Sequence, residues 1–455
     1  MTNAKAINPL DGRYEERTKA LQPYMSEYAL MQYRTMVECE FLIFLAESKI
    51  TSMRKLSDSE VKVIRALYEN FSDASYAKIK KFEATTNHDV KAVEYFIKEA
   101  LEKTSLKDTL EWVHFGLTSE DTNNSSYALM LSLAVKNVLL PELENISKNI
   151  EKFARENKSL PMLSRTHGQS ASPTTLGKEM AVFAYRLSRQ IKQLKNQKVM
   201  MKLNGATGNY NAFVAAYPKA NWPKFTEKFV AHLSKIAGVK LEANLITTQI
   251  ESHDTYVELF DIIRRANMVL LDFDQDMWRY ISDGYISQKP KAGEVGSSTM
   301  PHKINPIDFE NSEGNIGLAN SMFEFFARKL PVSRLQRDLS DSTVERAFGT
   351  AFGHSLLAYV MLSKGLSKIS VNKIKILEDL ENHPEVVAEA IQTVLRREKY
   401  PVPYEALKDL TRGKKVTMAD FAKFIDGLKV SPAIKTELKK FTPENYIGIA
   451  NKLVK

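Results

Sequence analysis

Apolar residues in the middle of the chain recur at alternating steps of three and four. The first such stripe consists of Met180, Ala184, Leu187, Ile191 and Leu194. This spacing brings the side chains onto one face of an α-helix. The same alternation recurs over residues 259–280 and 316–330, and a fourth long helical stretch begins near residue 119. Because each of these helices has an apolar face to bury, the pattern predicts a central bundle of long helices.

The regions before and after this bundle have shorter helical patterns. The later region is interrupted by Pro384, Pro401, Pro403, Pro432 and Pro443. Runs that alternate β-branched and polar residues are scarce, so any strands should be minor ribbons. A chain of 455 residues also exceeds what one hydrophobic core usually holds. We therefore expect an all-α fold with three helical domains, at residues 1–112, 113–366 and 367–455.

The composition is that of a packed globular protein, with 44% apolar and 26% charged residues. The single cysteine, Cys39, excludes an intrachain disulfide and a cysteine-rich metal site, and it favours a reducing compartment. No stretch approaches about 20 uninterrupted apolar residues, and the N-terminus lacks a secretory pattern. We therefore expect a cytoplasmic protein without a membrane partner.

Lysine and arginine exceed aspartate and glutamate by 64 − 55 = 9, an excess that suits nucleic acid, an acidic surface or small anionic substrates. The basic residues are spread along the chain, with local clusters at residues 198–202 (KVMMK) and 411–415 (TRGKK). A nucleic-acid groove is therefore the weaker interpretation, and most lysines are expected on solvated helix faces. Surplus apolar surface on the long helices predicts association of several copies.

Residues 293–315, GEVGSSTMPHKINPIDFENSEGN, lie between two of the apolar stripes. Their glycines and prolines prevent a continuous helix, and a loop of this length in a compact helical protein is usually functional or disordered. Pro306 fits the first turn of the next helix, with Asn305 as its N-cap. Two serines and Lys303 add donors that would stabilise negative charge on a carboxylate there. On residue types alone, a flexible Gly-Ser linker remains the alternative.

Residues 164–180, SRTHGQSASPTTLGKEM, place His167 shortly before the first apolar stripe. An imidazole suits a general acid near neutral pH, although a lone histidine where a helix begins is more often structural. We expect Pro173, Thr174 and Thr175 to open the helix.

Residues 111–124, EWVHFGLTSEDTNN, indicate a loop that leads into a long helix. Thr118 or Ser119 suits the N-cap, and Glu120 and Asp121 then fall in the first turn, where acidic side chains are stabilising. Capping alone explains these residues, but the free amides of a helix start also bind anions.

The sequence GSSTMPHKINP, residues 296–306, resembles the signature loop of the superfamily that contains fumarase, aspartase and argininosuccinate lyase. Members of this superfamily eliminate fumarate from succinyl compounds. The resemblance implies that Ser297, as a deprotonated hydroxyl, is the general base. It also implies that a substrate carboxylate is held by Lys303, Ile304 and Asn305.

The other two segments are similar to further motifs of the same superfamily. The segment around His167 resembles its histidine motif, which implies that His167 protonates the leaving nitrogen. Ser170 stands where close relatives typically have proline, and the histidine and glutamine of the motif are kept. The resemblance further implies that Thr118 and Ser119 contact a substrate carboxylate.

Four segments resemble the nucleotide-binding stretches of the adenylosuccinate lyase family: NPLDGRY, ATTNHDVKAVE, TTQIESHD and LPVSRLQRDLSDSTVERAF. The resemblance extends over nearly the whole chain and is closest to the bacterial branch. It implies that the phosphate end is bound by Arg13 and Tyr14. The nucleotide or succinyl group would be contacted by Asn87, His88 and Asp89, and the substrate positioned by Gln249 and Asn311. The nucleotide pocket would be completed by Arg337, Ser342, Thr343 and Arg346. On residue types alone, Asp338 or Asp341 pairs with these arginines on a helix surface.

The resemblance therefore implies a lyase of purine nucleotide biosynthesis. It would release fumarate by β-elimination from adenylosuccinate, giving AMP, and from SAICAR, giving AICAR. The resemblance implies a homotetramer with active sites shared between subunits, so that His167 and Ser297 come from different chains. It implies no cofactor, and no nucleic-acid or membrane partner.

Three alternatives stay open at this point. Argininosuccinate lyase is the first, and the candidate phosphate-binding arginines argue against it. The others are a catalytically silent protein on the same scaffold and a helical nucleic-acid-binding protein.

The remaining histidines are expected to pack or to form hydrogen bonds; they are His114, His232, His253, His302, His354 and His383. No HExxH pair or cysteine cluster is present, so no metal is implied. The sequence GATGNY, residues 205–210, lacks the spacing of a phosphate-binding or dinucleotide-binding loop and predicts a turn.

Overall fold

The computed structural model describes residues 4–289, 300, 302–413 and 415–455 of the chain. These residues group by their contacts into two compact units, each built from three segments. Unit 1 contains Met1–Leu143, Arg189–Met268 and Ser312–Val360, and unit 2 contains Glu144–Ser188, Val269–Asn311 and Met361–Lys455. The three-domain division based on the sequence stays a prediction.

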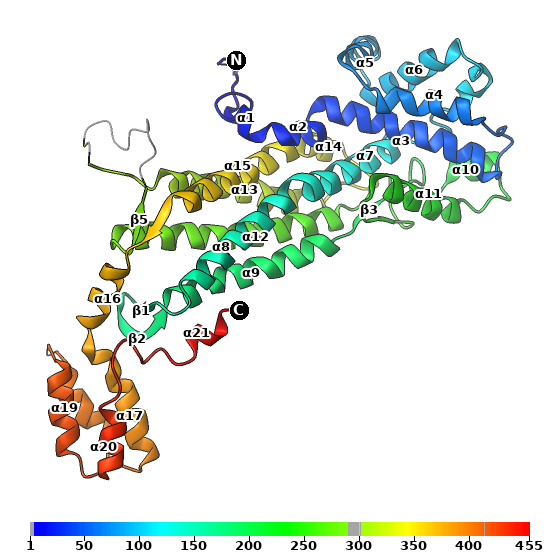
Figure 1. Cartoon of the computed structure of the whole chain (residues 1–455). Helices are drawn as coiled ribbons and strands as arrows, with labels where there is room; N and C mark the ends of the chain where they lie inside the picture. Colours follow the sequence, from blue (N-terminus) through cyan, green and yellow to red (C-terminus); the bar gives the residue numbers. More distant parts are fainter. Residues whose placement is uncertain (1–3, 290–299, 301, 414) are drawn as a thin grey trace. The chain divides into compact units, whose positions relative to one another are not determined.

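Helices dominate the described residues, which confirms the all-α fold class (Figure 1). The longer helices are α3 (Glu27–Ser48), α4 (Asp58–Glu69), α5 (Asp73–Thr86), α6 (Asp89–Glu102), α7 (Ser119–Ala134), α8 (Leu140–Glu156), α9 (Leu176–Asn196), α11 (Trp222–Ala237), α12 (Asp254–Ser282), α13 (Ile307–Lys329) and α15 (Phe348–Lys368). The shorter ones are α1 (Glu15–Thr18), α2 (Gln22–Met25), α10 (Asn211–Ala216), α14 (Ser340–Glu345), α16 (Lys373–Glu381), α17 (Ala388–Arg397), α18 (Pro403–Thr411), α19 (Met418–Gly427), α20 (Pro432–Leu438) and α21 (Ala450–Leu453). None of the described helices combines the length and the apolar character needed to cross a bilayer.

The predicted apolar stripes lie in long helices and are buried. The stripe that begins at Met180 lies in α9, and its five residues are each less than a tenth exposed. In unit 2, Phe183 of α9 meets Phe273 of α12 edge to face, with ring centroids 5.3 Å apart. Such pairs add to the stabilisation that comes from burial alone. The helix period in the sequence therefore located the faces that pack.

In unit 1, α12, α13 and α15 pack through aromatic side chains. The ring centroid of Phe260 lies 5.4 Å from that of Phe323 and 5.1 Å from that of Phe348. Beside this cluster, the side-chain amide of Asn267 donates a hydrogen bond to Asn320 (3.0 Å), and both residues are buried. A satisfied polar pair of this kind fixes the register of the helices that carry it.

In the part of the chain that the structure describes, the strands form three short two-stranded ribbons, and minor ribbons were what the sequence predicted. β1 (Pro161–Thr166) pairs with β2 (Gln169–Thr175) and β5 (Ile286–Gln288) with β6 (Ile369–Val371), both antiparallel. β3 (Val199–Met201) pairs with β4 (Leu241–Ala243) in parallel.

Two predicted helix starts need correction. Thr174 and Thr175 belong to β2, where they pair with Met162 and Pro161, so the predicted helix start is shifted toward the C-terminus. Thr175 nevertheless caps the helix as expected, because its hydroxyl accepts from the amide of Lys178 (3.2 Å). The next helix, α9, begins at Leu176. Pro306 lies just before α13 instead of within its first turn, and its carbonyl accepts from the amides of residues 309 and 310.

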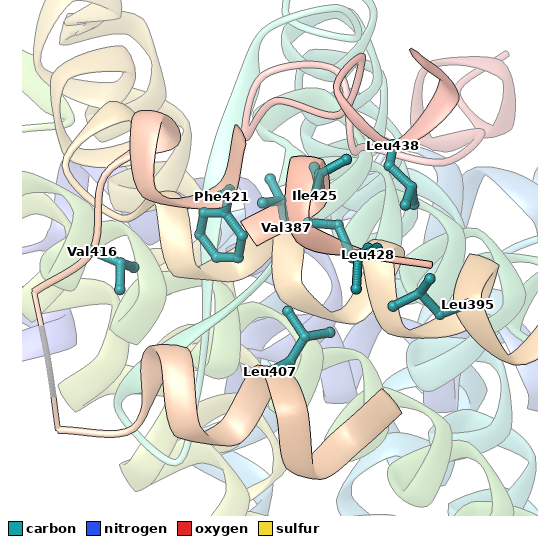
Figure 2. Close-up of a cluster of buried hydrophobic side chains, with 9 residues drawn as sticks. Val387, Leu395, Leu407, Val416, Phe421, Ile425, Leu428 and Leu438 are labelled. Atoms are coloured by element: carbon teal, nitrogen blue, oxygen red, sulfur yellow. The ribbon is translucent and has the colours of Figure 1, made fainter. Parts of the chain in front are cut away.

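The C-terminal part of unit 2 contains a separate small core of short helices, which the prolines of the sequence delimit. Figure 2 shows side chains from α17, α18 and α19 turned toward one another, with Leu395, Leu407 and Phe421 among them. Pro403 begins α18 and Pro432 begins α20, at the position where the missing N–H of proline costs nothing.

Candidate active site

His167 lies at the tip of the β1–β2 hairpin and not at a helix start. Thr166 pairs with Gln169, which leaves His167 and Gly168 as a two-residue turn with φ angles of 53° and 74°. Positive φ at both positions is the signature of a type I′ turn, whose twist matches that of a hairpin. The turn leaves His167 exposed, so the hairpin presents its imidazole to solvent.

The hairpin is fixed by an ion pair two residues before His167. Arg165 donates to the hydroxyl of Tyr285 (2.9 Å) and lies 2.6 Å from Oδ2 of Asp379, and the Tyr285 hydroxyl also donates to Asp379. Burial raises the pKa of Asp379, but the hydrogen bonds from Tyr285 and Arg165 outweigh burial, so the pKa is lowered. These contacts tie the hairpin to α16.

A cavity of about 590 Å³ adjoins the same hairpin. Thr166 and Gly168 line it from the turn, and charged side chains of both signs line it from the surrounding helices. Its volume lies within the range of small-molecule sites. A ligand in this cavity would lie beside His167.

The signature loop is described only at its C-terminal end. Ser297 lies outside the described residues. Lys303 and Ile304 are exposed and Asn305 is half-buried, immediately before α13. The carbonyl of Ile304 accepts from the side chain of Gln288 (3.0 Å). These three candidates therefore lie together at the start of a helix, where free amides favour an anion.

Contacts with α15 anchor both flanks of the loop. The amide of Lys289 donates to the carbonyl of Lys368 (2.7 Å). Asp308, in the first turn of α13, lies 3.1 Å from the Lys364 ammonium and 2.9 Å from that of Lys368. Asn311 follows one turn later and is half-buried. The flanks of the loop thus converge on Lys368.

In unit 1, the start of α7 is capped as predicted. Thr118 is the N-cap, and its amide donates to Oδ2 of Asp121 (2.9 Å). Asp121 is fully buried and lies 3.0 Å from the ammonium of Lys202. Asp121 is thus occupied by contacts within the fold, whereas the side chains of Thr118 and Ser119 are half-buried at this helix start.

His88 faces Ser119. Its Nδ1 accepts a hydrogen bond from the amide of Lys91 (3.2 Å), which caps α6, and its Nε2 lies 3.5 Å from Oγ of Ser119. A neutral imidazole that accepts at Nδ1 carries its proton on Nε2. Asn87 precedes it in the left-handed conformation (φ 50°) that ends α5, which asparagine tolerates. His88 and Ser119 therefore form a pair of donors from two helix starts.

Asp89 and Arg346, both predicted to bind substrate, form an ion pair. Arg346 and the buried Arg34 each lie 2.9 Å from Oδ2 of Asp89, and Arg346 also lies 3.0 Å from Glu27. Burial raises the pKa of Asp89, but Arg34, the amide of Val90 and Arg346 together lower it. An anionic ligand at Arg346 would compete with two carboxylates.

Gln249 and Arg337, which lie 88 residues apart in the sequence, also meet. Nη1 of Arg337 donates to the side-chain oxygen of Gln249 (3.3 Å), and the amide nitrogen of the Gln249 side chain donates to the carbonyl of Ala206 (3.1 Å). Nη2 of Arg337 lies 3.2 Å from Glu120 and 3.7 Å from Asp341. The alternative pairing of Arg337 with Asp341 is therefore present, but with Asp341 buried and not on a surface.

The other predicted nucleotide contacts are less closely grouped. Ser342 and Thr343 lie in α14, and the amide of Ser342 donates to Asp341 (2.7 Å). Arg13 stacks against Tyr14, 5.7 Å from the ring centre, just before α1. A cavity of about 330 Å³ is lined by Arg346, with residues 8, 11 and 27, but not by Arg13 or Tyr14.

Most of the histidines assigned structural roles have side-chain or backbone partners. The pairs are His114 with Glu38 (2.6 Å), His232 with Glu40 (2.7 Å), His253 with Glu345 (3.2 Å), His354 with Asn315 (2.8 Å) and His383 with the Asp379 carbonyl (2.6 Å). These contacts support the structural interpretation; His302 is exposed.

Sequence reasoning missed three residues that support these candidates. Glu120 faces Arg337, Arg34 faces Asp89, and Lys202 faces Asp121. Lys202 is an exception to the expectation that most lysines are solvated, because it is fully buried. Its buried neighbours in the sequence, Met201 and Leu203, are the signal that could have revealed it.

Comparison with known proteins finds relatives of one family that match nearly the whole chain. Residues 12–319 match the family described as Lyase, and residues 333–447 match the family described as Adenylosuccinate lyase C-terminal. Adenylosuccinate lyase of Vibrio cholerae is 50% identical over 98% of this chain and 98% of its own length. Those of Haemophilus influenzae and Escherichia coli K12 are 49% and 48% identical over 100% of this chain and 99% of theirs.

Solved structures share the fold at much lower identity. The 3-carboxy-cis,cis-muconate lactonizing enzyme from Pseudomonas putida has a TM-score of 0.73 and 18% identity, covering 98% of this chain and 97% of that one. Fumarate lyase from Mesorhizobium sp. BNC1 has a TM-score of 0.73 and 15% identity, covering 96% of each. Because the similarity includes the segments that carry His167, Gln249 and Arg337, the chain belongs to the adenylosuccinate lyase family.

Proposed function

We propose that the chain releases fumarate from adenylosuccinate, leaving AMP, and from SAICAR, leaving AICAR. One observation carries this proposal: enzymes named adenylosuccinate lyase are 48% to 50% identical to the chain over nearly its full length. Both products carry a phosphate, and arginines such as Arg337 and Arg346 suit its recognition. The elimination needs one proton removed and one supplied as the C–N bond breaks, which side chains can do, so the proposed reaction uses no cofactor. The free, buried Cys39 supports a reducing compartment, and we place the enzyme in the cytoplasm.

In the proposed reaction, Ser297 is the general base and His167 the general acid. Deprotonated Ser297 removes a proton from the succinyl Cβ, and the electron pair is delocalised into the neighbouring carboxylate. The C–N bond then breaks, a C=C bond forms to give fumarate, and His167 supplies the proton to the departing nitrogen. Lys303 and Asn305, which precede α13, would hold the added negative charge.

We assign recognition of the nucleotide to unit 1, where most of the candidate substrate-binding residues lie. The pair of donors formed by His88 and Ser119 suits a carboxylate of the succinyl group. Gln249 and Arg337 offer an amide and a guanidinium that already contact each other. Side chains held in place before binding lose less freedom when the substrate binds.

The proposed active form is a homotetramer whose sites are shared between chains. His167 is exposed on its hairpin, whereas proton transfer to a leaving group is favoured in a site closed to water. The long helices also expose large apolar side chains, at Tyr185 (68%) of α9 and at Leu318 (53%) and Phe325 (48%) of α13. Large apolar side chains exposed on long helices suit contacts with other copies of the chain. A single-chain mass in light scattering at micromolar concentration would contradict this assembly.

Mixing two inactive variants tests whether sites are shared. If His167 and Ser297 come from different chains, oligomers reassembled from equal amounts of His167→Asn and Ser297→Ala chains keep both native residues in about one site in four. Fumarate release should then recover to about a quarter of the wild-type rate. Each variant carried alone through the same treatment is the control and should stay inactive. Reassembled tetramers without recovery would place both residues of a site on one chain.

The substrate is tested by following the ultraviolet spectra of adenylosuccinate and SAICAR, with argininosuccinate in a parallel assay for fumarate. We expect conversion of the two nucleotides and none of argininosuccinate, because only the nucleotides carry the phosphate that the arginines recognise. Ser297→Ala is the control for a contaminating lyase. Turnover of argininosuccinate alone would overturn the nucleotide pocket, and turnover of neither class would overturn the enzymatic proposal.

A further inference from the structure

A cluster of ionisable side chains lies buried around Arg337 in unit 1. Glu120, Asp341 and Glu345 are 1%, 3% and 2% exposed, and His253 is fully buried. They come from the starts of α7 and α12 and from α14, so folding brings together groups that are far apart in the sequence. Three carboxyl groups thus face two cationic side chains away from solvent, where charge is costly unless it is paired.

Glu120 is the member of the cluster whose carboxyl group is least satisfied. Its Oε2 lies 3.2 Å from Nη2 of Arg337. Neither of its carboxyl oxygens has a hydrogen-bond partner among the residues that the structure describes, although buried carboxylates nearly always have one. The side chain therefore contacts a cation without the aligned hydrogen bonds that would hold it permanently as a carboxylate.

The surroundings of Glu120 bring the pKa of its carboxyl group close to neutral pH. Burial and the negative charge of Glu345 raise the pKa of Glu120 to about 8, although Arg337 and His253 act in the opposite direction. Asp341 adds a smaller upward effect. Burial lowers the pKa of His253, but Glu345 outweighs burial and raises it to about 9, so His253 stays cationic around pH 8.

The two tyrosines near the cluster do not ionise in the same range. Burial raises the pKa of Tyr256 and of Tyr127 well above that of an ordinary tyrosine. Glu251 accepts a hydrogen bond from the amide of His253 (2.7 Å). Glu120 is thus a carboxyl group whose charge changes around pH 8.

We propose that Glu120 is a positioning residue that controls how much of the Arg337 charge is available to the substrate. As a neutral carboxyl group, it leaves the guanidinium free to hold an anion. As a carboxylate, it pairs with the guanidinium and competes with that anion. The Arg337 side chain is 14% exposed and so is within reach of a ligand. This inference rests on the proposed function, in which Arg337 contacts the nucleotide.

Glu120 also connects two proposed substrate contacts. It directly follows Ser119 in the first turn of α7, and its side chain reaches Arg337 beside Gln249. A change in its charge therefore acts on the binding of the substrate and not on the atoms that react. The expected signature is a change in KM and in the dissociation constant, with kcat unaltered.

The pH dependence follows from the direction of the shift. Affinity for the nucleotide is complete below the pKa of Glu120 and falls as pH rises through about 8, because binding an anion at Arg337 then requires Glu120 to take up a proton. For a single group of this pKa, the dissociation constant should rise about fivefold between pH 8 and pH 9.

The test compares the wild-type enzyme with Glu120→Gln, which keeps the shape of the side chain but cannot ionise. The dissociation constant of AMP is measured by calorimetry on the intact oligomer between about pH 7 and pH 9. Between pH 8 and pH 9 we expect the fivefold rise in the wild type and a change of less than about twofold in Glu120→Gln. Asp338→Asn is the matched control, because Asp338 pairs with the exposed Arg334 on the same segment, and it should follow the wild type. A Glu120→Gln profile parallel to the wild type overturns the inference.

Two further measurements distinguish control of substrate binding by Glu120 from a purely structural role. At pH 7 and saturating adenylosuccinate, Glu120→Gln should keep the wild-type kcat, whereas loss of a structural support would lower it. If the variant does not fold, calorimetry of the wild type in two buffers of different ionisation enthalpy should show uptake of more than about half a proton on AMP binding near pH 8.5. No uptake overturns the inference. A wild-type protein that neither cleaves adenylosuccinate nor binds AMP contradicts the proposed function itself.

Discussion

Replacing His167 by asparagine is expected to lower kcat for adenylosuccinate cleavage by roughly 10²-fold to 10⁴-fold, the usual contribution of a general acid. Asparagine is the appropriate replacement because residue 167 has a φ of 53°, which asparagine adopts more readily than alanine. The turn and the oligomer should therefore stay intact, and KM should change little. The effect is measured as the rate of fumarate release at saturating substrate.

Deuterium exchange distinguishes loss of the general acid from loss of the site. In the proposed mechanism, Ser297 still removes the Cβ proton when His167 is absent. Adenylosuccinate recovered from heavy water with His167→Asn should therefore carry deuterium at Cβ although little is cleaved. Ser297→Ala should neither exchange nor cleave. Wild-type turnover by His167→Asn would show that another group protonates the leaving nitrogen.

The helix bundle could be predicted because its signal is local. Steps of three and four residues put Met180, Leu187 and Leu194 on one side of α9 whatever else the chain does, and all three are buried. The N-cap at Thr118 could be predicted for the same reason, since capping depends on the first turn alone.

The hairpin that carries His167 was missed because it lacks the usual strand signals. Residues 164–175 contain few of the branched or aromatic residues typical of strands, and the usual two-residue hairpin turn is Asn-Gly or Asp-Gly. His167-Gly168 adopts the same turn with a residue that seldom takes a positive φ. Its function could be inferred from the motif, but its presentation on a hairpin tip required the fold.

Long-range charge pairs could not be predicted at all. Stabilisation of the start of α7 already explains an acidic residue at Glu120. Its side chain nevertheless contacts Arg337, which lies more than 200 residues away in the sequence. Lys202 belongs to a basic cluster that suggests solvent, yet it is buried against Asp121. Such pairs depend on which segments meet in space, and residue type alone carries no information about that.

The largest loss of stability is expected from replacing Lys202 by methionine. The Lys202 ammonium lies 3.0 Å from Asp121, with both side chains fully buried, and it donates to the carbonyls of Gly205 (2.8 Å) and Gln249 (2.7 Å). Methionine fills a similar volume but leaves the Asp121 carboxylate without its cation. Breaking a buried ion pair from one side typically costs about 3–5 kcal/mol. The free energy of unfolding in urea should fall by this amount at a fixed protein concentration.

Lys198→Met is the matched control for this loss. Lys198 lies four residues earlier and pairs with Glu242 at the surface, with 61% of its side chain exposed, and surface pairs contribute only about 0–1 kcal/mol. Adding Asp121→Asn to Lys202→Met should recover part of the loss, because no charge is then left unpaired. Equal unfolding curves for Lys198→Met and Lys202→Met would contradict the buried pair. Because Lys202 also holds the carbonyl of Gln249, its replacement should weaken AMP binding as well, whereas Lys198→Met should leave that binding unchanged.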